Sequence, residues 1–136
     1  MFILDTNVVS ELRRREKANP KVVAWSASNP LASFFLSAVT LLELEIGALL
    51  IERRDKSQGR FLRAWIDAQL SRFNGRVLPV DTAVALRCAA LHVPDPRPER
   101  DALIAATALV HGMIVVTRNT ADFEATGARV FNPWDA

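Results

Sequence analysis

Short apolar segments that alternate with helical patterns limit the folds open to this chain. Five segments have the length and composition of buried strands: residues 2–4, 34–38, 76–80, 113–117 and 128–131. Strands joined through helices run parallel, and a parallel sheet is covered by helices on both faces. The pattern therefore predicts an α/β fold with a central parallel sheet of four to five short strands flanked by helices.

The stretches between these segments carry apolar residues at helical spacing. Asp81 is the expected N-cap of one helix, Gly112 ends another, and three prolines make residues 93–99 a loop. A chain of 136 residues without repeats or linkers is too short for two independent cores, so we expect a single domain over residues 1–136. The expected helices cover residues 8–17, 20–25, 40–54, 55–73, 82–91 and 101–111.

Cysteine content and hydropathy indicate a cytoplasmic protein. Cys88 is the only cysteine, so no disulfide can form within the chain and a reducing compartment is expected. The apolar start of the chain reaches Asp5 too soon for a signal peptide. The uncharged stretch 22–42 is long enough to cross a bilayer, but Asn29, Pro30 and four serines interrupt it, and we expect no membrane segment.

Acidic residues follow two of the expected strands. Asp5 comes directly after the first strand, and the segment 117–122 follows the fourth. In parallel α/β sheets the functional site lies at the carboxyl ends of the strands. A plain N-cap role explains Asp5 equally well, and Asp101, which opens an alanine-rich helix, has the same two interpretations.

Glu43 stands on an apolar helix face. It shares that face with Ile46 and Leu50, whereas Glu45 points about 160° away and is expected on the solvated side with Glu52. A carboxylate on an apolar face must shift its pKa, pair with a base or bind a metal. The alternative to a metal is a salt bridge to a buried arginine.

Several carboxylates gathered at one sheet edge favour a hard divalent cation, Mg²⁺ or Mn²⁺, because these ions prefer oxygen ligands. Zinc is not expected, since Cys88, His92 and His111 lack a ligand spacing. No Ser-His-Asp or Cys-His arrangement and no glycine-rich phosphate loop is recognisable among these residues.

Four stretches, in this order, resemble one known family. They are MFILDTNVVSELRR, SAVTLLELEIGALL, RDALIAATALVHGMIVVTRNTADF and FNPWDA, and together they span the chain. The chain resembles the PIN-domain ribonucleases, specifically the VapC-type toxins of bacterial toxin–antitoxin pairs and their FitB-like branch.

The resemblance implies an acidic metal site. Asn119 stands where the family commonly has its fourth acid, and Asp122, three residues later, is a candidate replacement for that charge. The implied metal ligands, which are also catalytic residues, are Asp5, Glu43 and Asp101. The implied supporting residues are Thr6, Asn7, Thr117 and Asn119.

The function implied by the resemblance is that of a Mg²⁺- or Mn²⁺-dependent endoribonuclease. Metal-activated water would cleave RNA phosphodiester bonds. The partners implied are a small cognate VapB-like antitoxin, an RNA substrate and a second copy of the chain in a homodimer, with DNA contacted only through the antitoxin. The alternative is an attenuated PIN scaffold that serves mainly as an antitoxin-binding, DNA-regulatory subunit, because Asn119 removes an acid from the site.

Basic residues are the candidates for RNA contact. The chain carries a formal net charge of +2, and four acids gathered in one pocket would leave +6 on the rest. A basic surface around an acidic pocket suits a polyanion, although solvated helix faces explain each basic cluster as well. The RNA-binding candidates are Arg13, Arg14, Arg15, Arg53, Arg54 and Arg118.

Overall fold

A computed structural model describes residues 1–136 and contains one five-stranded sheet in the order β3-β2-β1-β4-β5. Every neighbouring pair of strands is parallel, as expected. The predicted α/β architecture is therefore confirmed, with shorter strands than the sequence indicated. The strands are β1 (Phe2–Leu4), β2 (Phe34–Ser37), β3 (Val77–Leu78), β4 (Ile114–Val116) and β5 (Val130–Phe131).

Seven α-helices and two 3₁₀ turns, Leu31–Ser33 and Pro133–Asp135, surround the sheet. The first helix begins at Thr6 and ends at Leu12, earlier than the predicted 8–17. A single-turn helix after β4 was not predicted, because five residues are too few to show a helical period. The helices are α1 (Thr6–Leu12), α2 (Pro20–Ala27), α3 (Ala38–Glu52), α4 (Lys56–Arg72), α5 (Thr82–Leu91), α6 (Glu99–His111) and α7 (Thr120–Glu124).

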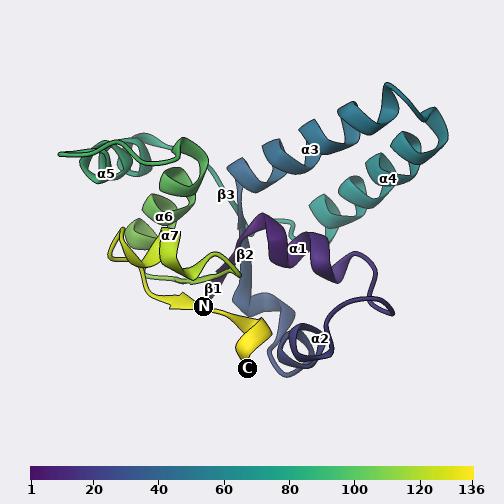
Figure 1. Cartoon of the computed structure of the whole chain (residues 1–136), viewed down its shortest axis with the longest axis horizontal. Coiled ribbons are helices and arrows are strands. Elements are labelled where there is room, and N and C mark those ends of the chain that lie inside the picture. The colour runs from purple at the N-terminus through teal and green to yellow at the C-terminus, as the bar shows by residue number, and fades with distance from the viewer.

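The sheet separates two layers of apolar side chains. On one face Ile3 and Val115 pack with Ile104 of α6 and Phe123 of α7. On the other face the neighbouring strand residue, Leu4, packs with residues of α1 and α2. Successive strand residues thus bury opposite faces, and Figure 1 shows α5, α6 and α7 on one side of the sheet with α1, α2 and α4 on the other.

Caps define the helix ends near the sheet. Asp81 accepts a hydrogen bond from Val84 N and Gly112 adopts φ 66° after α6, so both predicted caps are confirmed. The N-cap interpretation of Asp101 is wrong. Helix α6 begins at Glu99 behind Pro98, which places Asp101 inside the first turn. No helix is both long enough and apolar enough to cross a membrane.

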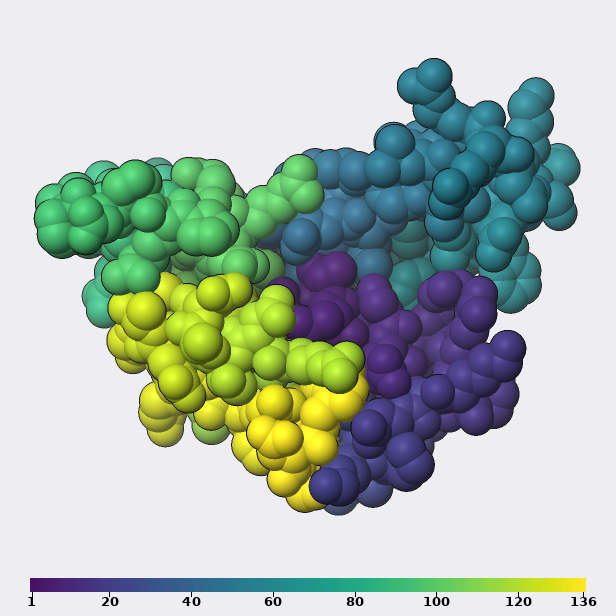
Figure 2. All heavy atoms as spheres, viewed as in Figure 1, coloured from purple at the N-terminus to yellow at the C-terminus, as the bar shows by residue number.

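Helices α3 and α4 form a long antiparallel pair that extends away from the sheet (Figure 1). Arg63 of α4 lies 2.6 Å from Glu45 and 3.9 Å from Glu52. The two glutamates lie on a solvent-accessible side of α3, as expected, and there they pair with Arg63 because α4 packs beside them. Figure 2 shows a notch between this pair and the α5–α6 pair, with the N-terminal segment, in purple, at its base.

Candidate active site

Two side chains meet where neighbouring strands end. Strands β1 and β4 pair in register at Leu4 and Val116, so the next residues, Asp5 and Thr117, stand side by side. The backbone N–H of Asp5 donates to Val116 O at 2.9 Å, and Thr117 Oγ1 donates to Asp5 Oδ2 at 2.8 Å. Both side chains are buried. This edge is the one at which the sheet topology predicts a site.

The carboxylate of Asp5 is held through both oxygens. Its Oδ1 accepts from the backbone N–H of Thr6 at 2.8 Å, and its Oδ2 accepts from Asn7 Nδ2 at 3.2 Å in addition to Thr117. Asp5 therefore caps α1 and faces the site at the same time, so the two interpretations of this residue do not exclude each other. Asn7 Oδ1 in turn accepts from Arg118 N at 3.3 Å, which links the ends of β1 and β4.

Glu43 approaches from the start of α3. Its Oε1 accepts from Thr6 Oγ1 at 2.8 Å, and Thr6 also lies 3.3 Å from Thr40 Oγ1. Its Oε2 lies 3.8 Å from Arg100 Nη1. The salt-bridge alternative for Glu43 is thus partly met, but the arginine side chain is 50% exposed rather than buried.

Electrostatics join the acids across the site. Burial raises the pKa of Asp5 to about 6, opposed by hydrogen bonds from Thr117 and Thr6 and reinforced by the charges of Asp101 and Glu43. Burial, followed by the charges of Asp122 and Glu43, raises the pKa of Asp101. The charge of Glu43 therefore acts on both Asp5 and Asp101, and the charge of Asp122 acts on Asp101. We call Asp5, Glu43, Asp101 and Asp122 the acid site.

The two candidates for the fourth acid position are both exposed. Asn119 precedes α7 and its backbone N–H donates to Thr117 Oγ1 at 3.0 Å, while its side chain makes no cap hydrogen bond. Asp122 lies in the first turn of α7, and its charge acts on Asp101. Asp122 thus supplies the fourth negative charge near Asp101. Asn119 supports the site through its backbone N–H, which donates to Thr117.

The donor set of the acid site fits a hard divalent cation. It offers carboxylate oxygens, and the nearby threonine and asparagine groups add neutral oxygens. A cation there would favour the ionised forms of Asp5 and Asp101, whose pKa burial raises and neighbouring acidic charges raise further.

A second group of potential ligands lies between the end of α5 and the start of α6. The ligand atoms of Cys88, His92 and Glu99 lie within 4.8 Å of one another, and we call this group the thiol cluster. The expectation that Cys88 and His92 lack a ligand spacing is wrong. Four residues apart at the end of α5, they share a helix face, and that spacing is the signal that could have found them.

Hydrogen bonding argues against a metal in the thiol cluster. His92 Nδ1 accepts from Arg97 N at 3.1 Å, so the ring proton belongs on Nε2, which lies 3.3 Å from Glu99 Oε2. A metal-bound histidine needs the lone pair of one nitrogen and donates from the other. Burial, followed by the charge of Glu99, also raises the pKa of the Cys88 thiol, which disfavours the thiolate that zinc requires.

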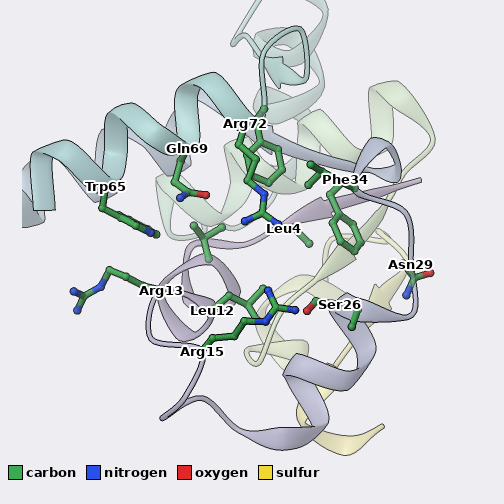
Figure 3. A pocket seen from close by; sticks show the side chains of 14 residues that line it. Leu4, Leu12, Arg13, Arg15, Ser26, Asn29, Phe34, Trp65, Gln69 and Arg72 are labelled. Atoms are coloured by element: carbon green, nitrogen blue, oxygen red, sulfur yellow. The ribbon is translucent and has the colours of Figure 1, made fainter.

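The predicted RNA-binding arginines are dispersed. Arg13 and Arg15 line a cavity of about 430 Å³ between α1, α2 and α4, and Figure 3 shows Arg15 and Arg72 extending into it. Arg53 lies at the far end of α3, about 15 Å along the helix from Glu43. Other members of the set are Arg14, which lines a separate groove, and Arg54, which lies just beyond α3.

Arg100 contacts the acid site directly, and Arg118 contacts it through the supporting residue Asn7. The guanidinium of Arg118 lies 5.3 Å from the ring of Trp134, while its backbone N–H reaches Asn7. Arg100 was missed by the sequence analysis. Its position beside Asp101 was the available signal, but only the fold brings α3 next to α6.

Comparison with known proteins gives the family. Residues 2–128 match the family model described as PIN domain. The chain belongs to the PIN-domain family. This PIN domain is 40% identical to "Toxin FitB" of Neisseria gonorrhoeae, over 98% of this chain and 99% of that protein. It is 36% identical to "VapC ribonuclease Y4jK" of Sinorhizobium fredii, over 99% of both chains.

Solved structures with the same fold include chains of FitAB and VapBC complexes. The PIN domain superposes on a chain of "FitAcB from Neisseria gonorrhoeae" with a TM-score of 0.91, 37% identity and complete coverage of both chains. A chain of "DNA bound VapBC from Salmonella typhimurium" gives a TM-score of 0.78 at 26% identity, over 97% of both chains. The likeness covers the whole domain, including every strand that positions the acid site.

Proposed function

We propose that this PIN domain is the toxin of a VapBC-type toxin–antitoxin pair and that it is an endoribonuclease. The observation that carries the proposal is the acid site itself. Asp5 is buried at the carboxyl edge of the sheet, and this burial raises its pKa to about 6. The charges of Asp101 and Glu43 raise the pKa of Asp5 further. The likeness to a relative named as a ribonuclease supports the same reaction class.

Asp5, Glu43 and Asp101 are the residues we assign to hold Mg²⁺ or Mn²⁺, with Asp122 as the fourth acid. When bound, the ion supplies Lewis acidity, which activates water and stabilises the negative charge that develops on the phosphate. Thr117 and Asn7 orient Asp5 through its Oδ2, and Thr6 orients Glu43 through its Oε1. These hydrogen bonds keep the two carboxylates in place before metal arrives.

The partners we propose are a VapB-like antitoxin and RNA, with DNA contacted through the antitoxin. The likeness to chains of FitAB and VapBC complexes supports the antitoxin. A homodimer is also proposed, because Leu42, Leu49 and Leu50 of α3 are 46–61% exposed and form an uncovered apolar surface. The proposed location is the cytoplasm.

Cleavage of RNA by purified, antitoxin-free protein tests the proposal. Discrete fragments are expected with Mn²⁺ or Mg²⁺, and none are expected with chelator or in the Asp101→Asn variant. Asp67→Asn is the matched control, because Asp67 is an exposed acid on α4. Equal cleavage by Asp101→Asn and Asp67→Asn would contradict the assignment of Asp101.

An alternative function follows from Asn119, which lacks the carboxylate that the family commonly has at this position. If folded wild-type protein with metal leaves RNA intact, the protein is an attenuated scaffold that binds antitoxin without cutting RNA. Asn119→Asp then restores cleavage if the missing acid is the cause.

A further inference from the structure

Arg100 stands out among the charged residues around the acid site. It is the only lysine or arginine with a side-chain nitrogen within 4.0 Å of a carboxylate of the four acids. Its own side chain makes no hydrogen bond that would fix it to the protein. The position of the Arg100 side chain is therefore not fixed by hydrogen bonds to the rest of the protein.

The two oxygens of Glu43 have different partners. Thr6 holds Oε1 by a hydrogen bond of 2.8 Å, whereas Oε2 faces Arg100 at 3.8 Å. Oε2 is thus the oxygen without a hydrogen bond and the more accessible one to a metal ion, and Arg100 faces this atom. A guanidinium and a divalent cation on one oxygen repel each other, so each weakens the binding of the other.

The contact between Arg100 and Glu43 is weak enough to exchange. The distance is long for an ion pair, and the side chains are 50% and 26% exposed. Arg100 also lies in the first turn of α6, where the helix dipole disfavours a cation. A half-exposed guanidinium at this place can turn outward at little cost, and phosphate is a ligand that it binds in bidentate fashion.

We propose that Arg100 is a phosphate-binding residue of this site, whose guanidinium rests on Glu43 Oε2 and moves to a phosphate of RNA when a divalent ion occupies the acids. The inference rests on the proposed nuclease function. It has two consequences of opposite sign: without RNA, Arg100 opposes metal binding, and with metal present, Arg100 favours RNA binding.

Metal affinity without RNA tests the first consequence. Mn²⁺ binding by wild type, Arg100→Gln and Arg129→Gln is measured by calorimetry. Arg129→Gln makes the same charge change at the amino end of β5, the opposite edge of the sheet. We expect Arg100→Gln to bind Mn²⁺ about 3- to 10-fold more tightly than the other two proteins. Unchanged or weaker binding by Arg100→Gln overturns the proposal.

Steady-state cleavage kinetics at saturating Mn²⁺ test the second consequence. In Arg100→Gln, we expect the KM for RNA to rise about 10-fold with a smaller change in kcat, and Arg100→Lys to restore part of the loss. An unchanged KM in Arg100→Gln overturns the proposal even if Mn²⁺ binds more tightly. Wild-type protein that cleaves no RNA marks failure of the proposed function instead, because the wild type carries Arg100.

Discussion

The acid site and the thiol cluster show how similar ligand atoms acquire different chemistry. The thiol cluster is the more compact, with its three ligand atoms within 4.8 Å of one another, yet its histidine is engaged by Arg97 and its thiol is kept neutral. The acid site is held open by hydrogen bonds that orient its carboxylates without neutralising them. Proximity of ligands is therefore a weaker guide to a metal site than the protonation that their neighbours impose.

The largest expected effect is the loss of RNA cleavage when the acid site, but not the thiol cluster, is altered. Asp5→Asn should lower metal-dependent RNA cleavage by at least about 100-fold, because it removes a charged ligand from the centre of the site. Glu99→Gln, the matched change in the thiol cluster, should leave cleavage within about twofold. Initial rates at saturating Mn²⁺ provide the measurement. A similar loss of cleavage in Asp5→Asn and Glu99→Gln would show that the acid site and the thiol cluster do not differ in their role in catalysis.

The pH dependence of stability distinguishes the groups without any substrate. The pKa of Asp5 is 3.8 in the unfolded reference and about 6 in the folded protein, so between these values the folded state binds more protons. Stability of the metal-free protein should therefore rise as pH falls from 7.5 to 5, by about 1–3 kcal/mol.

Urea unfolding in the presence of chelator measures this dependence. Asp5→Asn should flatten the curve and raise stability at pH 7.5, since it removes a carboxylate that burial penalises. Cys88→Ala should keep the wild-type slope, because burial raises the pKa of this thiol and it stays protonated over this pH range. A stability that falls between pH 7.5 and 5 in the wild type would show that the burial of Asp5 is not the dominant effect.

Metal-induced stabilisation is expected to be similar in size to the pH effect. Mn²⁺ at 100 times its Kd should stabilise the protein by about 2.7 kcal/mol, which corresponds to a rise in Tm of about 5–10 °C. The shift should disappear in Asp5→Asn and persist in Cys88→Ala. Differential scanning calorimetry records it, and a Tm that Mn²⁺ leaves unchanged in wild type would mean that the acid site does not bind this ion.

Much of the fold was predictable because its signals are local. Apolar strands, the cap at Asp81 and the stop at Gly112 each depend on a few neighbouring residues. Helix α7 is too short, at a single turn, to show a helical period. Of the two interpretations of Asp101, the cap interpretation failed because α6 begins directly after Pro98, two residues earlier.

The sequence by itself determined the order of strands and helices and the presence of acids directly after strands, since both follow from side-chain pattern along the chain. Only the tertiary structure decided the environment of those acids. Thr117 reaches Asp5 across 112 residues, and Arg100 faces Glu43 from a different helix. Hydrogen bonds and charges act through space, so the pKa of Asp5 and the competition at Glu43 depend on residues that no local pattern brings together.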